Sequence, residues 1–176
     1  MPPHKYTDAT SPKPKSKNQC VGTDRRYIRK IMSEFNIVYD LAASRDNAIV
    51  PKFITKEQNS LTTSWSNIPE LIFNSNNWGW LNPEYQDIMP WAKKCAQESL
   101  NGVNILMLVP ASVGSKWYAK WVEPYAEVRF NGSRLIFEGH TCPYPKDTML
   151  CLYKRGIVEK LLESKRRTCY VWDWKK

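Results

Sequence analysis

The chain is poor in the residues that bind metals or form disulfide frameworks. It has only two histidines, His4 and His140, far apart in the sequence, and its five cysteines are scattered without a Cys-x-x-Cys pair. A structural zinc site needs closely spaced Cys or His ligands, and a disulfide-stabilised domain usually has an even number of cysteines. We therefore expect no metal site, and we expect reduced thiols in a cytoplasmic setting.

Long hydrophobic runs are absent as well. No apolar stretch approaches the roughly 20 residues that a membrane-spanning helix needs. The first residues also lack the continuous apolar segment of a signal peptide. There is no Gly-x-Gly-x-x-Gly fingerprint of a dinucleotide site and no internal repeat. We therefore expect no membrane partner, and the sequence gives no motif-based indication of a dinucleotide site.

Basic residues outnumber acidic ones. The 176 residues include 26 Lys and Arg against 17 Asp and Glu, for a formal charge of +9, and 42% hydrophobic residues are enough for one domain with a core. The positive charge favours a polyanionic partner such as nucleic acid, and the alternative is a solvated basic surface. Residues 1–20 are rich in Pro, Lys and Ser, which predicts a disordered basic arm before a single domain over residues 21–176.

Hydrophobic periodicity predicts an α/β fold. Helical spacing of apolar residues predicts helices, which cover residues 25–35, 87–101, 116–122 and 157–162. Apolar runs predict strands, which cover residues 37–41, 78–81, 103–109, 148–153 and 170–172. Residues 126–130 and 134–137 flank Asn131-Gly132, a turn signal that predicts a late β-hairpin. Strands that alternate with helices imply a three-layer sandwich around a mixed sheet.

The segment Trp80-Leu81-Asn82-Pro83-Glu84-Tyr85 is the strongest candidate for a functional site. A short apolar strand ends there at a proline-stiffened turn, and ligands of open α/β sheets bind at the carboxyl ends of strands. The Asn82 side chain and the Pro83 carbonyl can accept hydrogen bonds from an exocyclic amine, and the Tyr85 ring can stack on a base. The segment therefore suits a flat, hydrogen-bonding substrate such as a nucleobase.

A second candidate lies at the end of the first predicted strand. Asp40 is followed by Leu41-Ala42-Ala43, and small residues let a ligand approach the backbone closely. The alternative is that Asp40 only caps the next turn. The polar stretch from Ser44 to Thr63 is long for a loop inside a compact domain, and such loops are usually functional or carry hidden structure.

Four segments carry a family resemblance. They are Tyr39-Asp40-Leu41-Ala42-Ala43; Thr55-Lys56-Glu57-Gln58-Asn59-Ser60-Leu61 with Trp65; Trp80-Leu81-Asn82-Pro83-Glu84-Tyr85; and Met107-Leu108-Val109-Pro110-Ala111 with Trp117 and then Gly132-Ser133-Arg134-Leu135-Ile136-Phe137. In this order they resemble the phage-type DNA N6-adenine methyltransferases, Dam-like enzymes that use S-adenosylmethionine. The third segment is similar to the family's Asn-Pro-Pro-Tyr, with Glu84 where a second proline is usual.

The resemblance implies a Rossmann-like class I methyltransferase fold and S-adenosylmethionine as cofactor. It implies methylation of adenine N6 in double-stranded DNA, at a specific site or with low specificity, by a phage enzyme that protects DNA from restriction in the host cytoplasm. By the same resemblance Asn82, Pro83 and Tyr85 would be catalytic. The implied cofactor-binding residues are Asp40, Ala42, Asn59, Ser60 and Asn82.

Basic side chains are the candidates for contact with DNA phosphates. They are Lys116, Lys120, Arg129, Arg134 and the cluster Lys165-Arg166-Arg167. Two other interpretations stay open. One is a nucleic-acid-binding or decoy protein that keeps the fold while Glu84 has removed catalysis, and the other is a methyltransferase that acts on RNA or on another amino-bearing base. None of these features predicts the oligomeric state.

Overall fold

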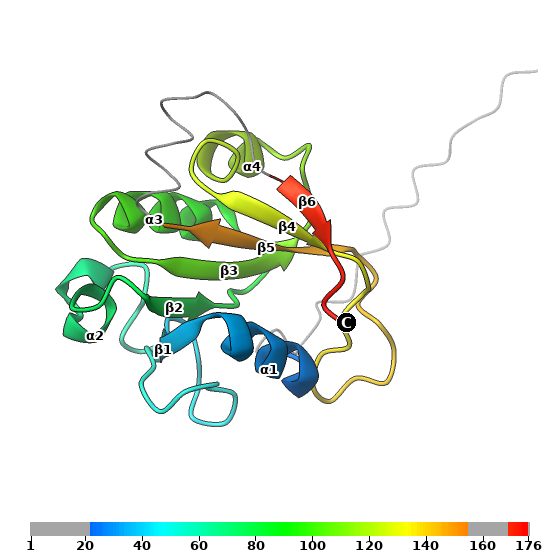
Figure 1. The fold of residues 1–176 in the computed structure, drawn as a ribbon, viewed down its shortest axis with the longest axis horizontal. Helices are drawn as coiled ribbons and strands as arrows, with labels where there is room; N and C mark the ends of the chain where they lie inside the picture. Colours follow the sequence, from blue (N-terminus) through cyan, green and yellow to red (C-terminus); the bar gives the residue numbers. More distant parts are fainter. Residues whose placement is uncertain (1–21, 155–168, 176) are drawn as a thin grey trace, which may run out of the picture.

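A mixed sheet forms the centre of the protein (Figure 1). The computed structural model describes residues 22–154 and 169–175, and in them six strands have the order β1-β2-β3-β5-β4-β6. The strands are β1 (Asn36–Asp40), β2 (Asn77–Leu81), β3 (Ile105–Pro110), β4 (Glu127–Asn131), β5 (Thr148–Tyr153) and β6 (Cys169–Trp172). β5 is antiparallel to its neighbours β3 and β4, and the other pairs are parallel. The carboxyl ends of β1, β2 and β3 therefore meet at one edge of the sheet.

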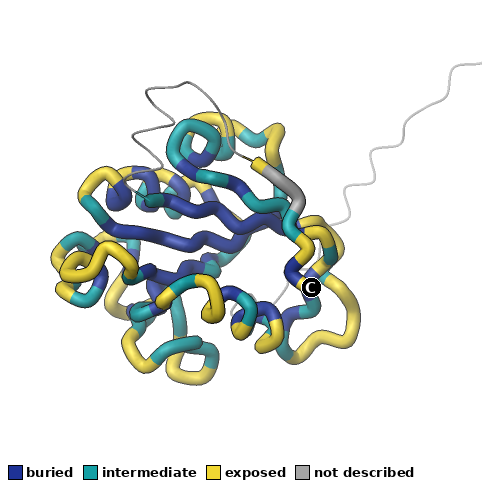
Figure 2. Tube along the Cα trace, viewed as in Figure 1, coloured by how far each residue is buried: buried dark blue, intermediate teal, exposed yellow. Residues whose placement is uncertain are grey.

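Each face of the sheet is covered by its own hydrophobic cluster. On one face, α1 (Arg25–Glu34) packs against a cluster that includes Leu106 and Leu108 of β3. On the other face, α3 (Met89–Leu100) packs against a cluster that includes Met107 of the same strand. Successive side chains of a strand point to opposite faces, so a continuous apolar run suits a strand covered on both sides. Figure 2 shows the central strands β3 and β5 buried along their length.

Local sequence signals account for the main helices. α1 begins after Asp24, whose carboxylate accepts a hydrogen bond from the backbone N–H of Arg26 at 2.7 Å, as expected of an N-cap. α3 and α4 (Lys116–Trp121) also lie where helices are predicted. Two short helices that follow the polar stretch from Ser44 to Thr63 were not predicted, namely the 3-10 helix η1 (Trp65–Asn67) and α2 (Pro69–Ile72).

The predicted hairpin around Asn131-Gly132 is wrong. β4 does end at Asn131, but residues 134–137 form no strand, and β4 instead pairs with β5 and with β6. Leu135 and Phe137 are buried in the cluster that faces α1. These two apolar side chains are two residues apart because an extended loop buries both of them. A half-buried strand has the same alternation of apolar and polar residues, so the sequence does not distinguish the two.

Several further predictions fall on residues outside the described ranges, or concern features that these ranges lack. The arm over residues 1–20, the helix over residues 157–162 and the cluster Lys165-Arg166-Arg167 lie outside the described residues. Within the described ranges, no helix has the length and apolar character needed to cross a membrane. The same ranges bring no three His, Cys, Asp or Glu side chains together in a way that could hold a metal ion.

Candidate active site

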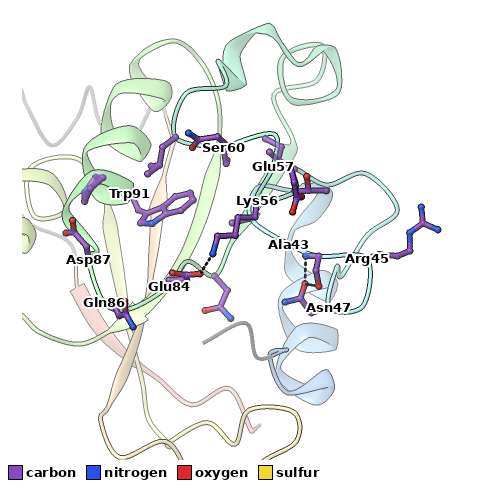
Figure 3. Close-up of a pocket in the computed structure, with 18 residues that line it drawn as sticks. Ala43, Arg45, Asn47, Lys56, Glu57, Ser60, Glu84, Gln86, Asp87 and Trp91 are labelled. Carbon is purple, nitrogen blue, oxygen red and sulfur yellow. Dashed lines mark hydrogen bonds and ion pairs between the residues drawn. The ribbon is translucent and has the colours of Figure 1, made fainter. Parts of the chain in front are cut away.

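A cavity of about 860 Å³ lies at the carboxyl edge of β1 and β2 (Figure 3). Its walls come from the residues that follow β1, from the loop over residues 54–61, and from the segment between Asn82 and Trp91 that follows β2. Ligand sites of α/β sheets occupy this position, and cofactor sites commonly measure about 300–1,000 Å³. The cavity therefore has the place and the size of a cofactor site.

Four of the five predicted cofactor-binding residues line this cavity, namely Ala42, Asn59, Ser60 and Asn82. The fifth, Asp40, is buried at the end of β1 and borders a small cavity of about 10 Å³ together with Ala42 and Asn82. The fold thus brings three separate segments of the chain to one place. Their part in cofactor binding stays a prediction.

The Asp40 carboxylate is held by the backbone of the turn that follows it. Its two oxygens accept hydrogen bonds from the backbone N–H groups of Ala42 at 3.3 Å and of Ile49 at 3.2 Å. Burial raises the pKa of Asp40 to about 6, and the two backbone hydrogen bonds oppose this rise because they favour the charged form. Asp40 therefore holds the turn after β1 against the strand, and it can change its charge near neutral pH.

Asp40 should make the stability of the protein depend on pH. Its pKa of about 6 in the folded protein lies above its ordinary value of 3.8. The folded state therefore prefers the protonated acid. The Asp40 contribution to stability is complete below pH 3.8 and is lost as the pH rises through about 6. The loss is of the order of 3 kcal/mol, because each pH unit between the two values corresponds to about 1.4 kcal/mol.

We expect Asp40→Asn to remove this dependence. Thermal unfolding midpoints of both proteins would be measured from about pH 4 to about pH 8, the range over which the contribution changes. The quantity compared is the slope of the unfolding midpoint against pH, because the amide also changes the absolute stability. Equal slopes in the two proteins would show that Asp40 keeps its ordinary pKa in the folded state.

Asn82 and Tyr85 are joined by a hydrogen bond. The Tyr85 hydroxyl donates to Asn82 Oδ1 at 2.9 Å, and Asn82 Nδ2 donates to the hydroxyl of Thr23 at 3.2 Å. Asn82 lines the large cavity, and Pro83 is buried next to it. The three predicted catalytic residues thus lie on one turn after β2, with the Asn82 amide at the cavity wall.

The Tyr85 ring lies in an aromatic cluster with Phe137 and Tyr144. The centroid of the Tyr85 ring is 6.2 Å from that of Phe137 and 5.7 Å from that of Tyr144, both in edge-to-face geometry. Burial raises the pKa of the Tyr85 hydroxyl well above its ordinary value, so the hydroxyl stays neutral and can donate. The loop between β4 and β5 is therefore folded back beside the turn after β2.

Glu84 lies at the cavity, opposite Lys56 (Figure 3). The distance from its carboxylate to the Lys56 ammonium is 3.8 Å, and the side chains of Lys56 and Glu84 are 84% and 45% exposed. An exposed ion pair contributes little to stability. Its effect here is on local charge, because Lys56 offsets the negative charge that replaces the family's second proline.

The loop that carries Asn59 is held in one conformation by its own hydrogen bonds. Asn59 adopts the left-handed region with φ of 51°. Its carbonyl accepts hydrogen bonds from the backbone N–H and the hydroxyl of both Thr62 and Thr63. Asparagine tolerates this conformation better than most residues. The Asn59 backbone is thereby held in place at the cavity wall.

Glu98 of α3 anchors the adjoining wall. Its carboxylate accepts hydrogen bonds from the backbone N–H groups of Trp65 at 3.1 Å and Ser66 at 2.9 Å, and from the Lys94 ammonium at 2.7 Å. The Trp65 indole N–H in turn donates to the Ser60 hydroxyl at 3.0 Å. Sequence reasoning missed Glu98, because Lys94 and Glu98 at i, i+4 spacing resemble an exposed ion pair on a helix.

The prediction that Arg129 contacts DNA is not supported by its position. Its side chain is only 14% exposed and pairs with Glu34 at 2.6 Å and with Glu127 at 3.6 Å. Its guanidinium also lies over the rings of Phe35 and Trp172. Two carboxylates and two rings engage this cation inside the fold, so its role is to join α1 to β4.

The other predicted DNA contacts are on the surface or outside the described residues. Lys116 and Lys120 are exposed on α4, and the Lys120 ammonium lies over the Trp121 ring. Arg134 is half-exposed and pairs with Asp147 at 3.1 Å. Arg166 lies outside the described residues. Their contact with DNA stays a prediction.

Comparison with known proteins agrees with the resemblance carried by the four segments. The sequence model of the family described as DNA N-6-adenine-methyltransferase (Dam) matches residues 10–149. The chain belongs to this family. The matched range contains the cavity, the turn after β2 and the loop with Phe137 and Tyr144, so the predicted Dam family assignment is confirmed.

Two curated relatives have the same printed name, DNA N-6-adenine-methyltransferase. The protein of Haemophilus phage HP1 (strain HP1c1) is 31% identical over 107 residues, which are 58% of this chain and 57% of that protein. The protein of Escherichia phage T1 is 30% identical over 89 residues, which are 51% of this chain and 34% of that protein. The chain thus matches little more than half of the first relative and a third of the second.

Proposed function

We propose that this protein transfers a methyl group from S-adenosylmethionine to N6 of adenine in double-stranded DNA. The observation that carries the proposal is the position of the Asn82 amide, on a turn with Pro83 and Tyr85, at the wall of a cavity of cofactor size. Membership of the Dam family and the names of the two phage relatives support it.

The residues of the cavity fit this cofactor. S-adenosylmethionine has a flat base, a sugar with hydroxyl groups and a positively charged end. The cavity offers apolar side chains from Ile54, Leu61 and Trp91 and carboxylates from Glu57 and Asp87. The nearby Asp40 carboxylate would favour the positive charge of the sulfonium when it is ionised. When bound, the cofactor supplies an electrophilic methyl group.

The work of the protein is then positioning and electrostatics. Asn82 Oδ1 and the Pro83 carbonyl would accept hydrogen bonds from the two N–H groups of the adenine amine, which would direct its nitrogen lone pair toward the cofactor. The cofactor would supply the methyl group as its sulfur–carbon bond breaks, and the surplus proton of the amine would leave to solvent. The Tyr85 hydroxyl occupies one acceptor position of Asn82 Oδ1, and an amide oxygen can accept a second hydrogen bond, here from the amine.

We extend the proposal to the fold family, to the residues that contact DNA and to the biological role. Helices on both faces of a mixed sheet, whose first three strands are parallel, support a Rossmann-like class I methyltransferase architecture. Lys116, Lys120 and Arg134 are proposed to contact DNA phosphates, because their side chains are at the surface. Protection of phage DNA from restriction in the host cytoplasm would be the biological role.

The test is methyl transfer from labelled S-adenosylmethionine to unmethylated double-stranded DNA, followed by digestion to identify the modified base. We expect label in N6-methyladenine from the wild-type protein. Glu84→Pro would be assayed beside it, because label in this variant alone would favour the decoy interpretation. Label in RNA and none in DNA would favour a methyltransferase that acts on RNA.

A further inference from the structure

Thr23 contacts the Asn82 amide although 59 residues separate the two in the sequence. We propose that Thr23 is a positioning residue for methyl transfer, whose hydroxyl holds the Asn82 amide in place at the cavity wall. The inference rests on the proposed function. It assigns a role to the segment before α1, which none of the sequence motifs includes.

The Thr23 hydroxyl is not used to begin the helix beside it. Asp24 is the N-cap of α1 and accepts the hydrogen bond from the Arg26 backbone, so Thr23 is not needed for that purpose. Thr23 is only 5% exposed. It borders the small cavity that Asp40, Ala42 and Asn82 share. Its hydroxyl is therefore buried against the candidate site, where a hydrogen bond is little weakened by water.

The reaction needs one orientation of the amide. The two ends of an asparagine side chain have nearly the same size, but only the oxygen accepts a hydrogen bond. A flipped Asn82 would present its NH₂ group to the NH₂ group of adenine, donor against donor. It could then neither hold the amine nor direct its lone pair.

One hydrogen bond does not fix the amide. A hydroxyl can donate or accept, so a single hydroxyl, whether of Tyr85 or of Thr23, is compatible with either end of the amide and leaves its plane free to turn. Among the described residues, the structure gives the Asn82 side chain a partner at each end, Tyr85 at Oδ1 and Thr23 at Nδ2. Loss of the Thr23 hydroxyl would release the Nδ2 end and let the amide rotate away from the acceptor amine.

A second set of hydrogen bonds joins the same three residue types, a tyrosine, an asparagine and a threonine. It provides a matched control for the Thr23 variants. The Tyr27 hydroxyl donates to Asn131 Oδ1 at 3.1 Å, and Asn131 Nδ2 donates to the Thr148 hydroxyl at 2.8 Å. Thr148 is buried, like Thr23, but it is not among the residues that line the large cavity. Loss of the Thr148 hydroxyl should therefore affect stability without affecting the reaction.

The experiment compares Thr23→Val, Thr23→Ser and Thr148→Val in the full chain. Valine keeps the shape of threonine and removes the hydroxyl, and serine keeps the hydroxyl. We expect Thr23→Val to slow single-turnover methyl transfer roughly 10- to 100-fold, the scale of a misplaced reacting group. Its dissociation constant for S-adenosylmethionine should stay close to that of wild type by calorimetry. Thr23→Ser and Thr148→Val should both keep the wild-type rate, and Thr148→Val should lower the unfolding midpoint.

Combination with Asn82→Ala separates positioning from a general structural role. If Thr23 acts through the amide, Thr23→Val should slow the Asn82→Ala protein no further, whereas independent effects would multiply. If Thr23→Val does not fold, the rate ratio of Thr23→Ala to Thr23→Ser replaces it. A wild-type rate in Thr23→Val, or an equal loss in Thr148→Val, would overturn the inference and leave the proposed function intact. No label from wild type on any DNA would overturn the proposed function itself, and the role of Thr23 with it.

Discussion

Asn82→Ala should lower the single-turnover rate of methyl transfer to DNA by roughly 100- to 1,000-fold, as found when one preorganised hydrogen-bonding group of an active site is removed. The variant loses the oxygen that would hold the acceptor amine and keeps the backbone of the turn. It also leaves the hydroxyls of Thr23 and Tyr85 without their partner on residue 82. The affinity for S-adenosylmethionine should fall far less, because the other walls of the cavity are unchanged.

The control for this variant is Asn131→Ala. Asn131 is buried between a tyrosine and a threonine hydroxyl in the same way, and it is not among the residues that line the large cavity. Rates would be measured well below the unfolding midpoint of each variant, with cofactor affinity followed by calorimetry. If Asn131→Ala lost as much activity as Asn82→Ala, or if Asn82→Ala stayed within about tenfold of wild type, Asn82 would not be the residue that holds the amine.

Glu98→Ala should lower the free energy of unfolding more than the other substitutions proposed for this protein. The side chains of Glu98 and Lys94 are only 6% and 15% exposed, and the Glu98 carboxylate accepts hydrogen bonds from Lys94 and from the backbone of Trp65 and Ser66. Removal of one partner of a buried ion pair costs about 3 kcal/mol or more, because the other charge is left uncompensated. For a chain of this size the unfolding midpoint should fall by roughly 10 °C.

Glu70→Ala is the matched control, because Glu70 pairs with Lys52 on the surface. Exposed ion pairs contribute little, so its unfolding midpoint should stay close to that of wild type. The Glu98 variant should also bind S-adenosylmethionine more weakly, since Glu98 orients Trp65 and the Trp65 indole holds Ser60 at the cavity wall. A change in midpoint no larger than that of Glu70→Ala would mean that the Glu98 contacts do not stabilise the folded state.

Errors in the sequence-based prediction have identifiable physical causes. The hairpin was predicted from the spacing of apolar residues around Asn131-Gly132, and the structure uses Leu135 and Phe137 as buried anchors of a loop. The prediction that Arg129 contacts DNA rests on its charge alone. Charge does not reveal that Glu34, 95 residues earlier in the chain, supplies a carboxylate 2.6 Å from the Arg129 guanidinium.

The sequence by itself determined the order and type of the main elements, the family and the Asn-Pro-Glu-Tyr turn after β2. These follow from local signals, namely apolar periodicity, caps and motifs of a few residues, which act between neighbours in the chain. Tertiary structure alone decided that Thr23 meets Asn82, that Glu98 holds Trp65 and that Tyr85 packs on Tyr144. These pairs come from segments far apart in the chain, and only the packing of α1, α3 and the loop after β4 around the sheet brings them into contact.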